Sequence, residues 1–299
     1  MNYKPKQREL YDVNGHKFNA KIDKDKYYTP VDLAKYCIDK TYEIIGKENI
    51  TEIIEPSAGN GSFSNQIENC IAYDIEPEGE NIIQQDFLGL DLKYKKGRLF
   101  IGNPPFGFRN NLALQFYKKC VNEGDYIAFI LPGSQFNNTV NMYEFDLIYS
   151  ELISADGFKD LYKNIKLTFN IYKRPSYGLN KKKKYKFEDF ELFEKIYVEG
   201  NEKRSREYPD NDYDFRICTW GRQCGKILNE DEHYAKEVGF YIHNKDMKNK
   251  IRKVIENMDI EKDFYMTSTP NLLLWQIYEY LIKNIPELQR DNDRQKKLF

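Results

Sequence analysis

The sequence predicts an α/β fold of the Rossmann type with a mixed sheet, followed by a smaller C-terminal α+β domain. In the first half of the chain, short apolar runs typical of buried strands alternate with patterns at helical spacing. Two of these runs end in turns rich in glycine or proline, at the strand ends where open α/β sheets place their ligands. The 299 residues, 40% of them hydrophobic, suffice for one large domain or two medium ones.

The first helix is predicted to begin at Thr29-Pro30, with Thr29 as N-cap and Pro30 at the first helical position. Gly46 ends it, and a second helical pattern covers residues 112–120. Strands are predicted at residues 50–55, 71–74, 99–101 and 126–131, with two late strands at 153–158 and 166–172. Too few residues follow position 74 for the usual crossover helix. A loosely held arm is expected for the polar residues 1–26.

Composition excludes several classes of protein. A formal net charge of −1 with 31% charged residues excludes a uniformly basic nucleic-acid binder, so contacts to phosphate must come from local patches. The five cysteines form no Cys-x-x-Cys pair, which favours a reducing cytoplasm. No apolar run reaches the roughly 18 residues of a membrane-spanning helix. The spacing of Cys218, Cys224, His233 and His243 is wider than in zinc sites, so no metal is predicted.

A glycine-rich turn follows the first predicted strand. It reads Glu55-Pro56-Ser57-Ala58-Gly59-Asn60-Gly61-Ser62-Phe63. Because Gly59 and Gly61 lack a Cβ, the backbone can approach a ligand closely, and a helix start behind them would offer N–H donors. Asp74 ends the next strand, where a carboxylate can accept hydrogen bonds from both hydroxyls of a ribose.

A second turn, Asn103-Pro104-Pro105-Phe106, follows the apolar run 99–101. The prolines have no N–H to donate and fix their φ angles. The Asn103 side chain and the Pro104 carbonyl can therefore serve as two rigid hydrogen-bond acceptors, with the Phe106 ring beside them. Two acceptors and a ring suit the exocyclic amino group of a planar base.

Together, these two turns resemble the motifs of the S-adenosylmethionine-dependent N6-adenine DNA methyltransferases. The similarity is to the group whose catalytic motifs precede the target-recognition region, and it covers about residues 27–174. The family reads (Asp/Glu)-Pro-(Ser/Ala)-x-Gly-x-Gly-x-Phe and (Asn/Asp)-Pro-Pro-(Tyr/Phe/Trp), in the order found here. The resemblance implies a Rossmann-like methyltransferase domain whose last strand is antiparallel.

The resemblance also implies roles for single residues. Cofactor-binding residues would come from three segments, with Thr29 and Pro30 near the methionine end and Glu55 attracting its ammonium group. Asp86 would meet the adenine amino group of the cofactor, and Phe87 would form the apolar wall beside that ring. Tyr162 would stack on the far face of a flipped base, with Phe169 in reserve. The cofactor-binding set is Thr29, Pro30, Glu55, Pro56, Ser57, Gly59, Gly61, Phe63, Asp74, Asp86 and Phe87.

The chain is thus expected to have an arm (1–26), a catalytic domain (27–174), a basic linker (175–186) and a target-recognition domain (187–299). The expected partner is double-stranded DNA, with a separate restriction endonuclease as a further partner. RNA N6-adenine, cytosine-N4 and release-factor glutamine methylation stay open, as does a non-catalytic nucleic-acid-binding partner.

Overall fold

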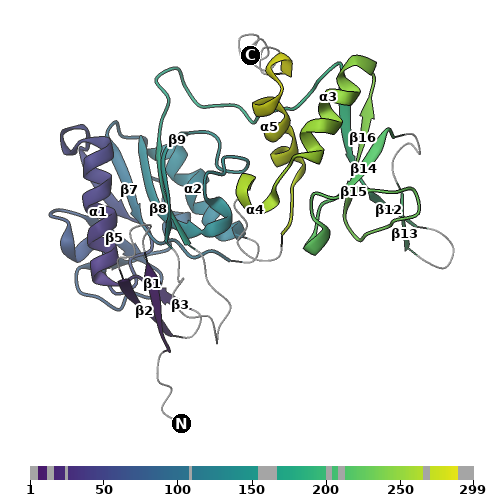
Figure 1. Ribbon diagram of the computed structural model, residues 1–299. Coiled ribbons are helices and arrows are strands. Elements are labelled where there is room, and N and C mark those ends of the chain that lie inside the picture. Colours follow the sequence, from purple (N-terminus) through teal and green to yellow (C-terminus); the bar gives the residue numbers. More distant parts are fainter. Residues whose placement is uncertain are drawn as a thin grey trace. The chain divides into compact units, whose positions relative to one another are not determined.

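The computed structural model describes residues 6–11, 17–23, 26–107, 110–153, 167–199, 204–207, 213–264 and 270–288. The chain divides into two compact units, Met1–Lys182 and Lys183–Phe299 (Figure 1). Each unit has hydrophobic core clusters of its own. The division falls inside the basic stretch 175–186.

The first unit is built on a seven-stranded sheet with the order β6-β5-β4-β7-β8-β10-β9. Its strands are β4 (Glu52–Glu55), β5 (Ile71–Asp74), β6 (Ile82–Gln84), β7 (Arg98–Gly102), β8 (Tyr126–Pro132), β9 (Asp146–Ile153) and β10 (Leu167–Lys173). The first five pair in parallel, whereas β10 pairs antiparallel with both β8 and β9. The prediction of a Rossmann-like mixed sheet with an antiparallel last strand is confirmed.

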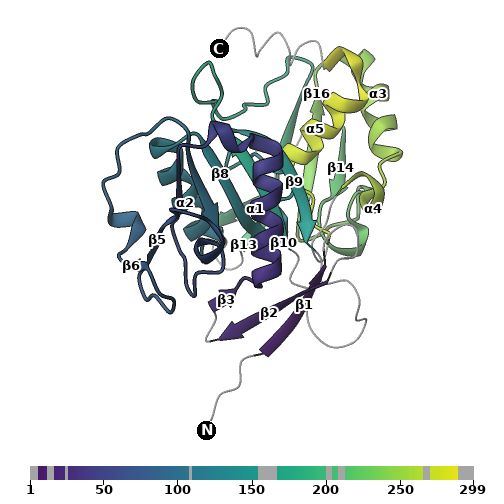
Figure 2. The same cartoon turned by 90° about the vertical axis from the view of Figure 1, so that its left-hand side faces the viewer.

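Two helices, α1 (Val31–Ile45) and α2 (Asn111–Glu123), cover opposite faces of this sheet (Figure 2). Successive side chains of β7 point to opposite faces of the sheet, so the strand packs against both helices. Leu99 and Ile101 pack in the cluster that contains the buried face of α1, and Phe100 packs in the cluster that contains α2. Residues 75–81 link β5 to β6 without a helix, as the short spacing predicts. The described residues also include the short 3-10 helices η1 (Lys47–Asn49), η2 (Ser64–Gln66), η3 (Phe87–Gly89), η5 (Gly133–Gln135) and η6 (Gly221–Gln223).

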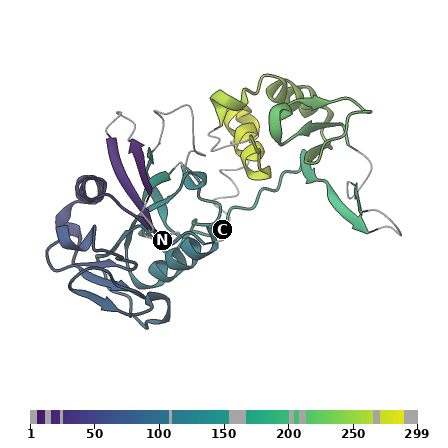
Figure 3. The same cartoon turned by 90° about the horizontal axis from the view of Figure 1, so that it is seen from below.

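The N-terminal segment differs from the loosely held arm that the sequence suggested. β1 (Lys6–Tyr11), β2 (Lys17–Asp23) and β3 (Lys26–Tyr28) form a three-stranded antiparallel sheet, in which β1 and β2 run side by side (Figure 3, purple). The signals for it are the period-2 pattern Phe18, Ala20, Ile22 and the dipeptide Asn14-Gly15, which is typical of hairpin turns. Most residues of this segment are polar, so the alternation was not recognised as a strand pattern.

One strand of the sheet, β9 (Asp146–Ile153), was not predicted from the sequence. The predicted strand at 153–158 stays a prediction, because residues 154–158 lie outside the described part of the chain. β9 is an edge strand, so its burial is incomplete and its apolar residues do not form a continuous run. The strand predicted at 166–172 is β10, displaced by one residue.

The second unit is an α+β domain. Its main sheet has the order β11-β16-β14-β15 and is antiparallel throughout, and β12 and β13 form a separate hairpin. The strands are β11 (Phe190–Glu194), β12 (Ile196–Glu199), β13 (Arg204–Glu207), β14 (Phe215–Cys218), β15 (Ile227–Leu228) and β16 (Glu237–Ile242). The helices are α3 (Lys245–Glu256), α4 (Ile260–Asp263) and α5 (Leu274–Asn284), and α3 and α5 supply apolar side chains to the core.

Candidate active site

The carboxyl ends of the parallel strands bring the two sequence motifs to one edge of the sheet. Residue pairing aligns Glu55 of β4 with Ala72 of β5, and Ile54 with Phe100 of β7. The glycine turn after β4, Asp74 at the end of β5 and Asn103 after β7 therefore lie at the same edge.

Asp74 holds the glycine turn in place. Its Oδ2 accepts the N–H of Gly59 at 2.7 Å, and its Oδ1 accepts the N–H of Glu76 at 2.8 Å. The Ala58 N–H donates to the Tyr73 carbonyl at 2.9 Å, which ties the turn to β5 again. Two backbone donors thus orient the carboxylate, and the same contacts fix the peptide plane of Gly59.

Gly59 leaves space for a ligand. Its φ is +54°, and no described atom outside its immediate chain neighbours lies within 4 Å of the point where a Cβ would stand. Gly61 has a φ of +79°, but a Cβ there would meet the Asn65 side chain at 2.6 Å. Both positions favour glycine for their backbone angles, and only Gly59 faces open space.

Glu55 is buried beneath this turn, with 2% of its surface exposed. Its Oε2 accepts the Ser64 N–H at 2.8 Å, and a Cβ on Gly102 would lie 3.4 Å from its Cγ. Burial raises the pKa of Glu55 to about 8, against the opposing effect of hydrogen bonds from Ser64 and Phe63. Burial therefore disfavours the ionised form of this carboxyl group, and a nearby cation would favour it.

Thr29 joins both motifs to the start of α1. Its Oγ1 accepts a hydrogen bond from Asn103 Nδ2 at 3.2 Å, and its carbonyl accepts one from Ser62 Oγ at 2.7 Å. It was predicted as the N-cap, but Pro30 occupies that position and Asp32 accepts the Leu33 N–H. The Thr29 hydroxyl is thus turned toward Asn103 instead of the helix.

The Asn-Pro-Pro-Phe turn is fixed at both ends. Pro104 is buried, Pro105 is exposed, and the half-buried Phe106 packs against both core clusters of the unit. The Phe106 carbonyl accepts N–H groups from the first turn of α2, at 3.1 and 3.3 Å. At the start of the turn, the Asn103 side chain is hydrogen-bonded to Thr29, and the Ser57 hydroxyl lies 3.4 Å from the Asn103 carbonyl.

The remaining predicted residues are placed as follows. Asp86 is exposed and caps η3, accepting the Leu88 N–H at 2.9 Å. Phe87 is buried in the core, where its ring stacks on Phe116 with centroids 5.7 Å apart. Phe63 is also buried in the core, and Pro56 and Ser57 belong to the turn itself. Phe169 lies buried on β10 in the core cluster that contains α1, and Tyr162 lies outside the described residues.

Sequence reasoning missed two groups that hold the site together. The Ser62 hydroxyl donates to the Thr29 carbonyl and lies 2.7 Å from Asn60 Oδ1. The Tyr28 hydroxyl donates to the Glu78 carboxylate at 2.7 Å, and the Glu78 N–H donates to the Gly59 carbonyl at 2.8 Å. Tyr28 directly precedes the predicted Thr-Pro pair, but no signal in the sequence identifies Glu78 as its partner.

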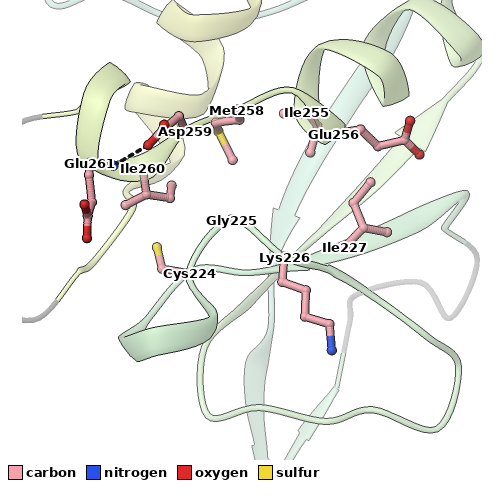
Figure 4. Close-up of a pocket in the computed structure, with 10 residues that line it drawn as sticks. All are labelled: Cys224, Gly225, Lys226, Ile227, Ile255, Glu256, Met258, Asp259, Ile260 and Glu261. Atoms are coloured by element: carbon pink, nitrogen blue, oxygen red, sulfur yellow. Dashed lines mark hydrogen bonds between the residues drawn. The ribbon is translucent and has the colours of Figure 1, made fainter.

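Two surface cavities are lined by other residues. One, of about 580 Å³, lies in the second unit, where Cys224, Met258 and Ile260 surround it (Figure 4). The other, of about 490 Å³, is bordered by η3 and α2. Among the described residues, no three metal-ligating side chains come together, and no helix there is long and apolar enough to cross a membrane.

No protein-family model and no curated protein matches the sequence. Solved structures of similar fold include a candidate RNA methyltransferase from Pyrococcus horikoshii, with 16% identity, a TM-score of 0.40, and 50% of this chain and 87% of that one covered. A candidate class I S-adenosylmethionine-dependent methyltransferase from Listeria monocytogenes has 12% identity and a TM-score of 0.41, and the match covers 55% of this chain and 65% of that one. Trm5 from Methanocaldococcus jannaschii, solved in complex with adenosine, has 16% identity and a TM-score of 0.34, and the match covers 57% of this chain and 58% of that one.

Proposed function

We propose that this chain is an S-adenosylmethionine-dependent methyltransferase that modifies the N6 amine of adenine in double-stranded DNA. The observation that supports this proposal most directly is the meeting of the glycine turn, Asp74 and Asn103 at one edge of the sheet. Thr29 adds to it, because it is hydrogen-bonded to residues of both motifs.

The residues at this edge fit the cofactor. Asp74 would accept the ribose hydroxyls, with its carboxylate already oriented by two backbone donors. The open space beside Gly59 would admit the cofactor next to the turn. Glu55 would respond to the ammonium group by releasing its proton, and Asp86 and Phe87 are assigned to the adenine end by family resemblance alone. When bound, S-adenosylmethionine supplies an electrophilic methyl group on a positively charged sulfur.

Asn103 and Pro104 would prepare the amine. The lone pair of N6 is delocalised into the adenine ring, which makes this nitrogen a weak nucleophile. Hydrogen bonds from the N6 hydrogens to Asn103 Oδ1 and the Pro104 carbonyl would favour a more tetrahedral nitrogen whose lone pair is localised. The bond from Asn103 Nδ2 to Thr29 Oγ1 supports this role, since it sets which end of the amide is the acceptor.

The target base must leave the duplex to reach a site at the edge of a sheet. Phe106 would stack on the extruded base and replace part of the stacking that the base loses. The ring is half-buried, and its backbone is fixed by two hydrogen bonds from α2, so stacking on it would cost little ordering.

The test is a labelled-methyl transfer assay that offers duplex DNA, structured RNA and a protein mixture separately. We expect label in the DNA, at adenine N6 after hydrolysis to nucleosides. Asn103→Ala should abolish transfer and leave cofactor binding within about threefold of the wild type. Asn122→Ala, which changes an exposed asparagine on α2, is the matched control and should keep full activity.

Other outcomes would select other functions. Label in RNA, in cytosine N4 or in a protein glutamine would replace the proposed substrate with that one. Cofactor binding without any transfer would indicate a non-catalytic nucleic-acid-binding partner. Retained transfer by Asn103→Ala would contradict the role of the Asn-Pro-Pro-Phe turn.

A further inference from the structure

The helix α3 of the second unit has one buried face and one basic face. Met247, Ile251 and Ile255 are buried in the core of the unit. On the opposite side, Lys245, Asn249 and Lys253 follow one another at a spacing of four residues, and all three are exposed. Residues four apart lie on the same side of a helix, so they form a continuous row, which we call the α3 ridge.

The other cations of α3 are engaged in ion pairs that hold the helix. Lys248 Nζ lies 2.6 Å from Asp214, and Lys250 Nζ lies 2.5 Å from Glu287, so each fastens α3 to another part of the unit. The guanidinium of Arg252 lies 2.9 Å from Glu256 and 5.5 Å from the centre of the Phe215 ring.

The two lysines of the ridge differ from these three. Neither Lys245 nor Lys253 forms an ion pair with any residue in the described part of the chain. The acids of α3 are Asp246, which lies at the positive end of the helix dipole, and Glu256, which is paired with Arg252. The ridge therefore presents two lysines that form no ion pair in the described part of the chain, with an amide between them and the Asp246 carboxylate beside the first.

We propose that the α3 ridge enters the major groove of B-form DNA, with Lys245 and Lys253 on phosphates and Asn249 on a base edge. This rests on the proposed function for the choice of DNA as partner. At 1.5 Å per residue, Lys245 and Lys253 lie about 12 Å apart along the axis. The major groove admits an α-helix, so the two lysines would meet phosphates at two points along the groove. Asn249 lies midway, and an asparagine amide can bind the N6 and N7 edge of adenine with two hydrogen bonds.

The experiment measures binding of the full chain to duplex DNA by fluorescence anisotropy over a range of salt concentrations, without cofactor. Lys245→Ala and Lys253→Ala should each lower the slope of log K against log salt by about 1, and the double variant by about 2. Lys262→Ala, an exposed lysine on α4, is the matched control and should keep the wild-type slope. Equal thermal midpoints for all variants would establish that the fold is kept.

A second measurement selects bound duplexes from a random pool. Asn249→Ala should bind the duplex preferred by the wild type about five- to a hundredfold more weakly and lose the base preference at one position. The lysine variants should keep that preference. Because neither measurement uses methyl transfer, a failure here leaves the proposed reaction intact, and a failure of the reaction leaves this test valid.

Two results would overturn the inference. One is an unchanged salt slope and an unchanged selected pool in all three ridge variants. The other is an equal loss of binding to a fully paired RNA duplex, because the deep and narrow major groove of A-form RNA does not admit a helix.

Discussion

Replacing Gly59 with alanine should remove cofactor binding at a small cost in stability. The φ of +54° lies in the left-handed region, where a residue with a Cβ costs about 1–2 kcal/mol. The reduced entropy of the unfolded chain offsets about 0.4–1 kcal/mol of this. No described neighbour would be displaced, so the net loss is about 1 kcal/mol, or roughly 2–4 °C in melting temperature for a unit of this size. The new methyl group would occupy the space assigned to the cofactor.

Gly178 provides the matched control for this variant. It lies in the same unit, has a φ of +106°, and also has no described atom within 4 Å of an added Cβ. Gly178→Ala should therefore lose similar stability while binding S-adenosylmethionine like the wild type. Isothermal titration calorimetry with both variants measures the difference. If Gly59→Ala bound the cofactor as tightly as Gly178→Ala, the assignment of the glycine turn to the cofactor would be refuted.

Three further predictions concern charged groups. Because burial raises the pKa of Glu55 from 4.5 to about 8, the folded chain holds this proton more tightly than the unfolded chain and loses stability as pH rises from 4.5 to about 8. Urea unfolding at about pH 5 and pH 9 should show a smaller loss for Glu55→Gln. Asp74→Asn leaves one of two backbone N–H donors without an acceptor, so it should lower the free energy of unfolding by about 1–3 kcal/mol. It should also weaken cofactor binding at least about tenfold. An unchanged affinity in calorimetry would count against the ribose contact. Arg216→Met removes one of two cations bound to the buried Glu237 carboxylate, at 3.0 Å, and leaves Lys195 at 2.9 Å, so it should destabilise the second unit by about 1–3 kcal/mol. Hydrogen exchange should then rise in β14 and β16, and an equal rise in β4–β8 would contradict this.

The central strands were predictable from the sequence because both of their faces are buried. Tyr126–Pro132 and Arg98–Gly102 appear as nearly continuous apolar runs between turns, a pattern that polar surface strands lack. The glycine and proline turns were predictable for a different reason, since their backbone angles and missing donors restrict the residue types. These two signals predicted the central parallel strands and the turns at their carboxyl ends, whereas the antiparallel last strand was expected from the family resemblance.

The edge elements and the cross-connections were not predictable in the same way. β2 alternates between apolar and polar residues, and Ser150 and Glu151 interrupt the apolar residues of β9, so a search for continuous apolar runs passes over both strands. The contacts of Thr29 with Asn103 and of Tyr28 with Glu78 join residues 74 and 50 positions apart. Such pairings depend on how loops meet in three dimensions, which neither periodicity nor a local motif encodes.

The bond between Thr29 and Asn103 has a consequence for choosing the limits of a minimal catalytic fragment. A shortened polypeptide that starts at Val31 would retain every strand of the seven-stranded sheet and all of α1. It would nevertheless lose the hydroxyl that orients Asn103 and the carbonyl that receives Ser62. Trimming chosen from secondary structure alone would therefore remove two contacts of the proposed site, and a starting point before Tyr28 keeps both.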